Sequence, residues 1–505
     1  MLNIPNINPT DANGFFVAFP KTEFGSYAPD SDEVRFKLYT DQYEVRINGE
    51  PCPTRSCRVS KIPFNRPYPG KQRPFSQSEE AGFISFSSDE DVEIEVFAKD
   101  EFEDAIVRPL SKNVGVEKAE KRVRFTLKSH GAYTLELDGS HRVLHIFFDS
   151  IKKKDGKDPS TFYFGRGIHF PGTVHLRSGD SVYVDPEAIV FGSFVANGAK
   201  DIRIFGGGTI DGSLEERITE NCYEDHTKGN VRLYNCKNVN IEDVILTDSA
   251  TWSLALFGCE NVNIDTVKIV GQWRYNTDGI DIVNSKSVNI KNSFVRSFDD
   301  TVTLKGIYSH PDDIRDFTVE SSVFWCGWGH TCEIGIETDA RAYRNITFKN
   351  CDIIHASGPA LATLGGNGAV IENISYENIR VEFQSDTLPE ILQKTDAQVY
   401  DGKAGDAKAV LLRISNEPYA IRHKNSERVE RRASEKLGAI RGVRFKDIQV
   451  FTDSESIRPC VDVFEKGCGN ISDIRIENLV LNGKKQTDLS NFNKRTGAFS
   501  DLTII

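Results

Sequence analysis

Short runs of alternating apolar and polar residues dominate the chain from residue 200 onwards. One phrase returns throughout, a polar residue followed by an alternating strand, as in KNVNI (237–241), ENVNI (260–264) and KSVNI (286–290). Its central apolar residues lie at positions 202, 239, 262, 288, 317, 346 and 374, with separations of 37, 23, 26, 29, 29 and 28 residues. A repeat of about 20 to 50 residues is typical of solenoids and propellers, and a period of two directs alternate side chains inward and outward.

The length of these units favours a parallel β-helix. No helical pattern of about 10 to 15 residues separates the runs, which argues against a doubly wound α/β fold. A propeller blade needs about 40 residues and four strands, more than most of these units contain. Coils of 23 to 29 residues fit a right-handed parallel β-helix, a solenoid in which each coil buries its inward row against the next. The Asn of NVNI either stacks along a turn or is an ordinary turn residue.

Residues 1–150 have a different pattern. Their alternating strands, such as VEIEVFA, RVRFTL and VLHIFFD, have the spacing of an antiparallel β-sandwich. The charged segment SIKKKDGKDPST (150–161) is the expected linker. We therefore predict an all-β chain, with a β-sandwich domain at 1–150 and the β-helix at 151–505.

An insertion at about 383–438 interrupts the repeat of the predicted β-helix. It ends in the charged stretch RHKNSERVERRASEK. Such a stretch is usually a solvated face, and the alternative is a loop that overhangs a cleft.

Composition excludes several classes of protein. Of the 505 residues, 39% are hydrophobic and 27% charged, as in globular proteins, and the net charge of −12 argues against a nucleic-acid partner. No run approaches the roughly 18 apolar residues that span a bilayer, so no membrane partner is expected. The start, MLNIPNINPT, has no basic region and no apolar core. We expect a cytoplasmic protein, or a secreted one whose signal peptide has been removed.

The ten cysteines form no CxxC pair, so a zinc site has little support. Cys236 and Cys259 end similar phrases 23 residues apart, as one recurring position of the repeat would. Buried free thiols are favoured over disulfides.

Three aspartates are the candidate catalytic residues. Asp278 belongs to NTDGID, and Asp299 and Asp300 belong to SFDD, 21 and 22 residues later. Positions about one coil apart lie above one another on neighbouring strands, about 4.8 Å apart. The three carboxylates are therefore expected to cluster, provided that Asp299 and Asp300 lie at a strand end or bulge, because adjacent residues of a strand point to opposite faces.

Clustered carboxylates suit glycoside hydrolysis. Like charges in proximity raise at least one pKa and leave a protonated acid beside ionised bases. Hydrolysis of a glycosidic bond needs an acid to protonate the leaving oxygen and a base to activate water, and it requires no metal or cofactor. The alternative is a set of turn aspartates, which are common in solenoids.

Aromatic and polar residues near these motifs are candidates for binding a sugar. Exposed aromatic rings stack on sugar faces, whereas buried rings fill the coils. His330 follows Asp300 by 30 residues, about one coil, and is placed to hold an aspartate. The predicted substrate-binding residues are Trp273, Tyr275, Lys305, Trp328, His330, Glu333 and Glu337.

At these motifs the chain resembles the polygalacturonase family, glycoside hydrolase family 28, and its relatives, the family 49 dextranases and isopullulanases. The likeness runs from about 163 to 376 and rests on NTDG, on the DD of SFDD and on Gly329–His330, the start of a GHG motif. The resemblance implies an inverting hydrolase in which Asp299 is the general acid, while Asp278 and Asp300 activate the water. The sandwich that precedes the helix is similar to the family 49 layout.

Two departures from the family pattern bear on the substrate. Thr331 stands where the second Gly of GHG is expected, and the Arg-x-Lys pair that holds the galacturonate carboxylate in that family has no match, since the next coil reads EIGIET. We therefore expect an inverting glycoside hydrolase that acts on a poly- or oligosaccharide, with a neutral α-glucan favoured over pectin. The alternatives are a polygalacturonase, a β-helix polysaccharide lyase and a non-catalytic glycan-binding solenoid.

Overall fold

The computed structural model describes residues 2–5, 16–18, 35–66, 73–152, 161–215, 229–310, 312–395, 397–425, 428–433, 436–466, 470–496 and 502–505. Its strands form one 30-stranded sheet, two five-stranded sheets and three two-stranded sheets. The only helices among these residues are two 3-10 turns, η1 (Phe75–Gln77) and η2 (Leu110–Lys112). No described helix is long and apolar enough to span a bilayer.

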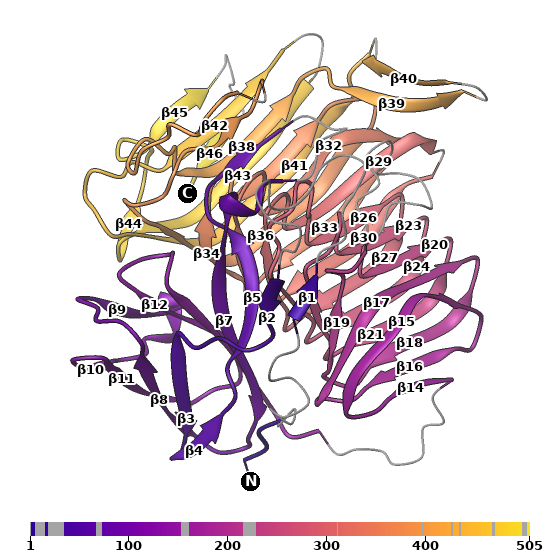
Figure 1. Ribbon diagram of the computed structural model, residues 1–505. Coiled ribbons are helices and arrows are strands. Elements are labelled where there is room, and N and C mark those ends of the chain that lie inside the picture. The colour runs from indigo at the N-terminus through magenta and orange to yellow at the C-terminus, as the bar shows by residue number, and fades with distance from the viewer. Residues whose placement is uncertain are drawn as a thin grey trace.

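The amino-terminal part is a sandwich of two sheets, drawn in indigo and purple in Figure 1. One sheet has the order β10 (Glu117–Ala119), β11 (Arg122–Leu127), β8 (Val92–Ala98), β3 (Tyr43–Ile47) and β4 (Glu50–Cys52). The other has the order β5 (Arg55–Ser60), β7 (Ser78–Ser87), β13 (Val143–Asp149), β12 (Gly131–Leu137) and β9 (Ala105–Arg108). Alternating burial along β3 and β8 places one face of each strand in the core between the sheets. The pair β7–β13 is parallel, the one departure from antiparallel pairing within these two sheets.

The 30-stranded sheet winds as a β-helix with three strands in a regular coil, and each strand pairs in parallel with its counterpart one coil on. The first face consists of β15 (Gly167–Leu176), β17 (Ala188–Asn197), β20 (Val231–Tyr234), β23 (Leu254–Phe257), β26 (Ile280–Val283), β29 (Val302–His310), β32 (Cys332–Ala340), β35 (Leu361–Gly365), β38 (Val410–Asn416), β42 (Cys460–Glu465) and β45 (Asn493–Thr496).

The second face consists of β14 (Phe162–Phe164), β16 (Ser181–Val184), β18 (Lys200–Phe205), β21 (Lys237–Glu242), β24 (Glu260–Asp265), β27 (Lys286–Lys291), β30 (Ile314–Glu320), β33 (Ala342–Lys349), β36 (Val370–Phe383), β41 (Ala439–Thr452), β43 (Asn470–Leu481) and β46 (Leu502–Ile504). The third face consists of β19 (Thr209–Asp211), β22 (Ile245–Thr247), β25 (Lys268–Val270), β28 (Phe294–Ser297), β31 (Val323–Cys326) and β34 (Asp352–Ala356), after which β36 and β41 extend onto it. The hairpin strand β44 (Lys484–Gln486) pairs antiparallel with β43.

The repeated phrase of the sequence forms the strands of the second face of the helix. The predicted central positions stack in register from Ile202 through Val239, Val262 and Val288 to later coils, and each is buried in one continuous core. Asn261, which has left-handed backbone, donates its side-chain amide to Asn238 of the preceding coil at 2.8 Å. Of the two alternatives for this asparagine, the structure shows the stacked one. The predicted fold class, a right-handed parallel β-helix preceded by a sandwich, is also confirmed.

The eight cysteines that the structure describes are free thiols, and Cys236 and Cys259 lie buried on successive coils. The other two, Cys222 and Cys468, lie outside the described residues. For the eight, the expectation of thiols over disulfides is confirmed.

The prediction of one insertion at about 383–438 is wrong, because the regular strand β38 divides this segment into two parts. Before β38, β37 (Ile391–Leu392) pairs with β6 (Phe64–Asn65) of the amino-terminal part. After it, β39 (Ala420–Asn425) and β40 (Arg428–Ala433) form a hairpin that lies against β29 and projects at the upper right of Figure 1. One further pair, β1 (Phe16–Ala18) and β2 (Arg35–Lys37), completes the strands.

The sandwich packs on the third face of the helix. A shared apolar cluster joins the outer side of β5, β7 and β13, including Phe83 and Phe147, to Phe294, Val323 and Ile354 of the helix. The turns that lead from the third face to the first therefore run close to the sandwich. These turns carry the aspartate motifs.

Candidate active site

The residues predicted to be catalytic meet in one row of turns. Asp278 precedes β26, Asp300 precedes β29 and His330 precedes β32. The N–H of Gly279 donates to the Asp300 carbonyl at 2.8 Å, and the N–H of Thr301 donates to the His330 carbonyl at 2.8 Å. Asp278, Asp300 and His330 thus occupy equivalent positions of three successive coils.

Asp299 and Asp300 share the turn between β28 and β29. Neither residue is part of a strand, so the alternation that separates neighbouring side chains does not apply to them. Both are partly exposed, whereas Asp278 is buried behind them. Asp299 and Asp300 therefore lie between two strands, as the predicted clustering of the three carboxylates required.

The Lys305 ammonium lies at the centre of the carboxylates. Its Nζ is 2.7 Å from Asp278 Oδ2, 2.9 Å from Asp281 Oδ1 and 3.3 Å from Asp300 Oδ2. Burial alone would lower the pKa of Lys305, but the three carboxylates outweigh it and raise that pKa. Lys305 therefore remains a cation and compensates much of the negative charge of the cluster.

Asp281 is a buried member of the site that the motifs did not reveal. It lies on β26, between Ile280 and Ile282, which belong to the core of the helix. The alternation of IDIV directs Asp281 outward, and strand register places it in line with Thr303 and Glu333. This alternation was the available signal.

The neighbouring carboxyl groups differ in proton affinity. Burial, and then the charges of Asp278 and Asp300, raise the pKa of Asp299 well above its usual value. Burial also raises the pKa of Asp278 to about 6, against the effect of Lys305. Burial would raise the pKa of Asp300 too, but Lys305 and His330 outweigh it and lower that pKa. Asp299 thus keeps a proton to a higher pH than Asp300, which is the division that acid–base catalysis needs.

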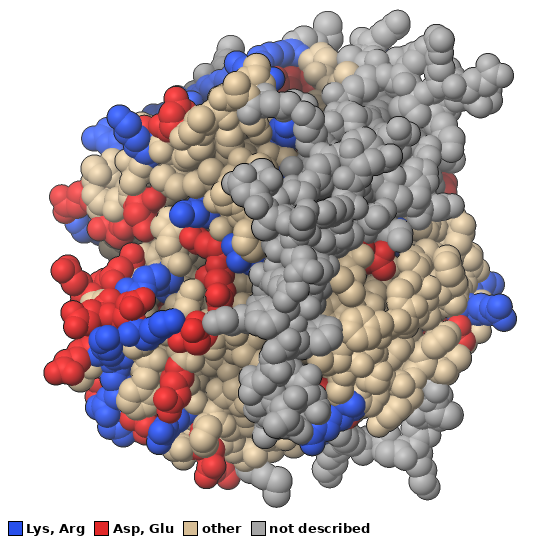
Figure 2. Space-filling view, viewed as in Figure 1, with Lys and Arg blue, Asp and Glu red and all other residues tan. Residues whose placement is uncertain are grey.

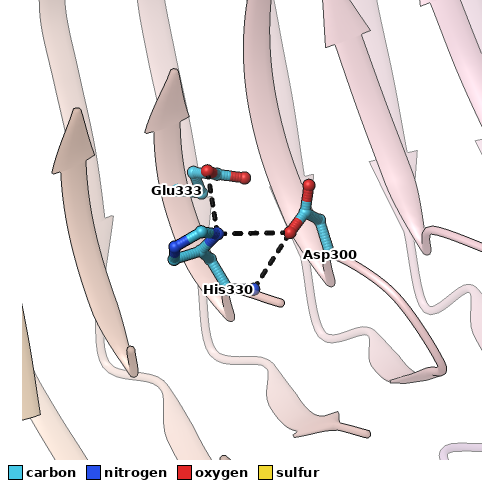
Figure 3. A group of neighbouring side chains, drawn as sticks. All are labelled: Asp300, His330 and Glu333. Carbon is cyan, nitrogen blue, oxygen red and sulfur yellow. Dashed lines mark hydrogen bonds and ion pairs between the residues drawn. The ribbon is translucent and has the colours of Figure 1, made fainter. Parts of the chain in front are cut away.

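His330 bridges Asp300 and Glu333 (Figure 3). Its backbone N–H donates to Asp300 Oδ1 at 2.9 Å, and its Nδ1 lies 3.4 Å from the same oxygen and 3.0 Å from Glu333 Oε1. The Thr303 hydroxyl donates to Glu333 Oε2 at 2.8 Å. Burial alone would lower the pKa of His330, but the charges of Glu333 and Asp300 outweigh this effect, and the net pKa is raised. An imidazolium here holds Asp300 ionised and in place.

The same three residues have the spacing of a metal site, with ligand atoms within 4.8 Å of one another. A metal ligand must be a deprotonated imidazole nitrogen. The two carboxylates that raise the pKa of His330 favour the protonated ring instead. In this structure His330 is hydrogen-bonded to both carboxylates, and a cation bound there would have to displace its proton.

Gly329 is required by the close approach of the turn to the aspartates. Its φ is +81°, and a Cβ would lie 2.4 Å from Asp300 Oδ1. Its N–H donates to Glu390 Oε1 at 2.7 Å, which brings the segment before β38 to the site. At the next position but one, Thr331 is buried and donates its N–H to the Pro359 carbonyl at 3.0 Å, as in the regular ladder. A second glycine is thus not needed there.

The aromatic residues predicted to bind sugar lie in different surroundings. Trp273 is fully buried, and its ring packs edge-on against Phe75, with 6.0 Å between centroids. Tyr275 is also buried, and its hydroxyl donates to Gln393 Oε1 at 3.2 Å. Stacking on a sugar requires an exposed face, which neither ring has in this structure. Trp328, in the turn after β31, is partly exposed.

The predicted acidic residues on β32 also differ in exposure. Glu333 is buried, and Glu337 is partly exposed, near enough to Lys305 to raise its pKa. The motif EIGIET belongs to the same coil as His330 rather than to the next one. The strand that stacks on it, β35, reads LATLG and carries no basic residue either. Neither β32 nor β35 therefore carries an Arg-x-Lys pair.

Residues 152–389 match the model of the family described as Glycosyl hydrolases family 28. The polygalacturonase of Gossypium barbadense is 27% identical over 223 residues, which are 42% of this chain and 52% of that protein. The exopolygalacturonase of Oenothera organensis is 32% identical over 167 residues, 30% of this chain and 42% of that protein. The chain thus spans about half the length of the curated relatives that it matches.

Among solved structures, Dex49A from Penicillium minioluteum has a TM-score of 0.57 and 13% identity, over 97% of this chain and 98% of that chain. This likeness shows a shared fold over almost the whole chain. The resemblance to family 28 that the motifs predicted is confirmed. The part of the chain that the family model covers is thus a parallel β-helix similar in sequence to glycoside hydrolases of family 28.

Proposed function

We propose that the whole chain is an inverting glycoside hydrolase that cleaves a poly- or oligosaccharide. The observation that carries the proposal is the pair Asp299 and Asp300, which are adjacent in one turn yet have pKa values shifted in opposite directions. One carboxyl group that keeps its proton beside one that loses it is what glycosidic cleavage requires.

In this mechanism Asp299 gives its proton to the glycosidic oxygen as the bond from that oxygen to the anomeric carbon breaks. A water molecule attacks the anomeric carbon from the opposite face of the ring, and its proton passes to Asp300 or Asp278. Asp278 is buried, 1% exposed, whereas Asp300 is partly exposed and can meet this water directly. Lys305 and His330 hold the bases ionised and in position.

A neutral glycan, such as an α-glucan, is the favoured substrate. The outward residues of β17, β20 and β23, on the face that leads to the site, include Phe257, which is partly exposed and stacks on the buried ring of Tyr234 with centroids 4.8 Å apart. Arg232 is the one cation among those outward residues. Figure 2 shows charged residues gathered over the sandwich, whereas the described surface over these strands is mainly uncharged. Aromatic rings and few cations suit sugar faces better than uronates.

The match to Dex49A, at 13% identity, is a likeness of fold and leaves the sugar open. The names of the sequence relatives favour a different substrate, pectin. A polygalacturonase is therefore the second candidate. It would need a cation for the uronate carboxylate, and Arg232 and Arg413 are the nearest outward arginines on the first face, with Arg413 paired to Asp462 at 3.1 Å.

Two other classes are less well supported. A polysaccharide lyase needs a basic residue that accepts the proton beside a uronate, but Lys305 is held as a cation by three carboxylates. A non-catalytic glycan-binding solenoid has no need of neighbouring carboxyl groups with opposed proton affinities.

The test is a panel of dextran, pullulan, polygalacturonate, arabinan and xylan, followed by reducing-end assay and by absorbance of unsaturated products. We expect new reducing ends from a neutral glucan, without absorbance, and a product whose anomeric configuration by proton NMR is the inverse of the substrate's. Activity should be unchanged by EDTA. Reducing ends from polygalacturonate alone would select the second candidate. Absorbance, or loss of activity on chelation, would select a lyase, and binding without cleavage of any glycan would contradict a hydrolase.

A further inference from the structure

The carboxyl group proposed as the general acid is bound by a residue from outside the β-helix. Asn65 Nδ2 donates to Asp299 Oδ2 at 2.8 Å, across 234 positions of sequence. Asp299 Oδ1 accepts the N–H of Asp300 at 3.1 Å. Both oxygens of Asp299 therefore have a fixed partner, and the partner of Oδ2 comes from the amino-terminal part of the chain.

The orientation of the Asn65 amide is determined by a second bond. Its Oδ1 accepts the backbone N–H of Arg66 at 2.9 Å, so the oxygen faces Arg66 and the NH₂ group faces Asp299. Asn65 is 6% exposed, so water has little access to this contact. A buried amide of known orientation is a specific hydrogen-bond donor.

The strand that carries Asn65, β6, is held by the segment before β38. Its partner β37 comes from the segment before β38, and the Asn65 carbonyl accepts the Gln393 N–H at 2.6 Å. Phe64, 1% exposed, packs edge-on against Tyr400 of the same segment, with centroids 5.6 Å apart. The catalytic turn, the amino-terminal part and this segment thus form one unit.

Arg73 joins the amino-terminal part to the same turn. Its guanidinium lies 3.9 Å from the centroid of the Phe298 ring, next to Asp299, and its Nη1 donates to the Trp273 carbonyl at 2.7 Å. Arg73 is fully buried. The backbone on either side of the contact between Asn65 and Asp299 is thereby fixed.

We propose that Asn65 is a positioning residue for Asp299, which places the carboxyl group of the general acid and sets the pH at which it loses its proton. This inference rests on the proposed glycosidase function. A hydrogen-bond donor that holds a catalytic carboxyl group in one rotamer keeps its acidic proton aimed at the leaving oxygen. The same N–H stabilises the ionised carboxylate and so limits how far burial raises its proton affinity.

The test compares Asn65→Leu, which keeps the branched shape without polar atoms, with Asn65→Asp, which replaces the donor by a carboxylate, and with Asn65→Gln, which keeps the amide. The readout is the pH profile of kcat and kcat/KM of the full chain on the glycan that the panel identifies. Loss of the donor should raise the pKa of Asp299, so the alkaline limb should move to higher pH. The shift should be largest for the Asp variant, smaller for Leu and smallest for Gln. We expect kcat to fall about tenfold for Leu with KM little changed, short of the roughly 10²–10⁴-fold that a general acid contributes.

A matched control is Ser111→Ala, which removes another contact between sandwich and helix, the 2.6 Å bond from Ser111 Oγ to Asp352 Oδ1. It should leave the alkaline limb in place. Superposable profiles for the parent and the Asn65 variants, or an equal shift in Ser111→Ala, would overturn the proposal. Asp299→Asn, measured in parallel, separates the two hypotheses. If that variant stays active, the assignment of the acid fails and the role of Asn65 with it. If it is inactive while the Asn65 variants match the parent, the role of Asn65 alone fails.

Discussion

At the scale of single residues, Lys305 is the cation shared by the carboxylates proposed to be catalytic. It contacts Asp278, Asp281 and Asp300, and it lowers the pKa of Asp278 and of Asp300. A base must be ionised to accept a proton from water, so activity should fall as the pH drops through the pKa of Asp278, which burial raises to about 6.

We therefore predict that Lys305→Met moves the acidic limb of kcat/KM to higher pH. Without the cation the carboxylates hold their protons more tightly, so the bases become ionised only at a higher pH. The measurement is the pH–rate profile, with Lys286→Met on the second face as the control. An acidic limb that stays in place would show that Lys305 does not set the ionisation of the bases.

The proton on Asp299 gives a second prediction at this scale. Asp299→Asn keeps the shape of the side chain but cannot give a proton to the leaving oxygen, so kcat should fall by about 10²–10⁴-fold. Asp201→Asn is a suitable control, because Asp201 is exposed on β18 with a φ of +58°, where asparagine is equally well tolerated. Near-parental activity of Asp299→Asn, with an unchanged Tm, would contradict its assignment as the acid.

At the scale of single elements, the turns of the second face are stabilised by asparagine. Asn261 combines a left-handed φ of +59° with the bond to Asn238. Asn261→Ala removes the bond and places alanine, which lacks the polar side chain that makes asparagine tolerant of left-handed backbone, at this position, so the free energy of unfolding should fall by about 1–3 kcal/mol. Asn261→Gly restores the backbone freedom and should recover part of the loss.

Thermal unfolding checks this prediction, with activity as the control, since Asn261 is exposed on the face away from the catalytic turns. Equal Tm values for the Ala variant and the parent would show that the stack contributes no stability. A Gly variant less stable than Ala would show that the conformational argument is wrong.

The same elements explain how much the sequence could predict. Inward and outward positions repeat with each coil, so the stacking of Val239, Val262 and Val288 and the meeting of Asp278 with Asp300 follow from spacing alone. The burial of Trp273 does not, because Phe75, which covers its ring, lies almost 200 positions away. Contacts made across the chain leave no period in the sequence.

At the scale of the whole molecule, the sandwich and the helix share both a core and ion pairs. Arg108 of the sandwich lies 2.9 Å from Glu136 and also pairs with Glu382 of the helix, while Glu136 Oε1 lies 2.5 Å from His355 Nε2. All four are nearly inaccessible to solvent. Separating the two parts would expose the apolar cluster around Phe83 and leave buried charges without partners, which is costly.

We therefore predict that a fragment of residues 161–505, without the sandwich, aggregates or unfolds at a lower temperature than the full chain. It loses the apolar cover of the third face and also Asn65, so any fragment that folds should hydrolyse glycan more slowly, with its alkaline limb moved to higher pH. Size-exclusion chromatography, thermal unfolding and the pH–rate profile test these points. A soluble fragment with the Tm and the pH profile of the full chain would show that the sandwich is an accessory part and that the helix alone builds the site. A folded fragment that is slow in the predicted way would show that the sandwich contributes to catalysis as well as to stability.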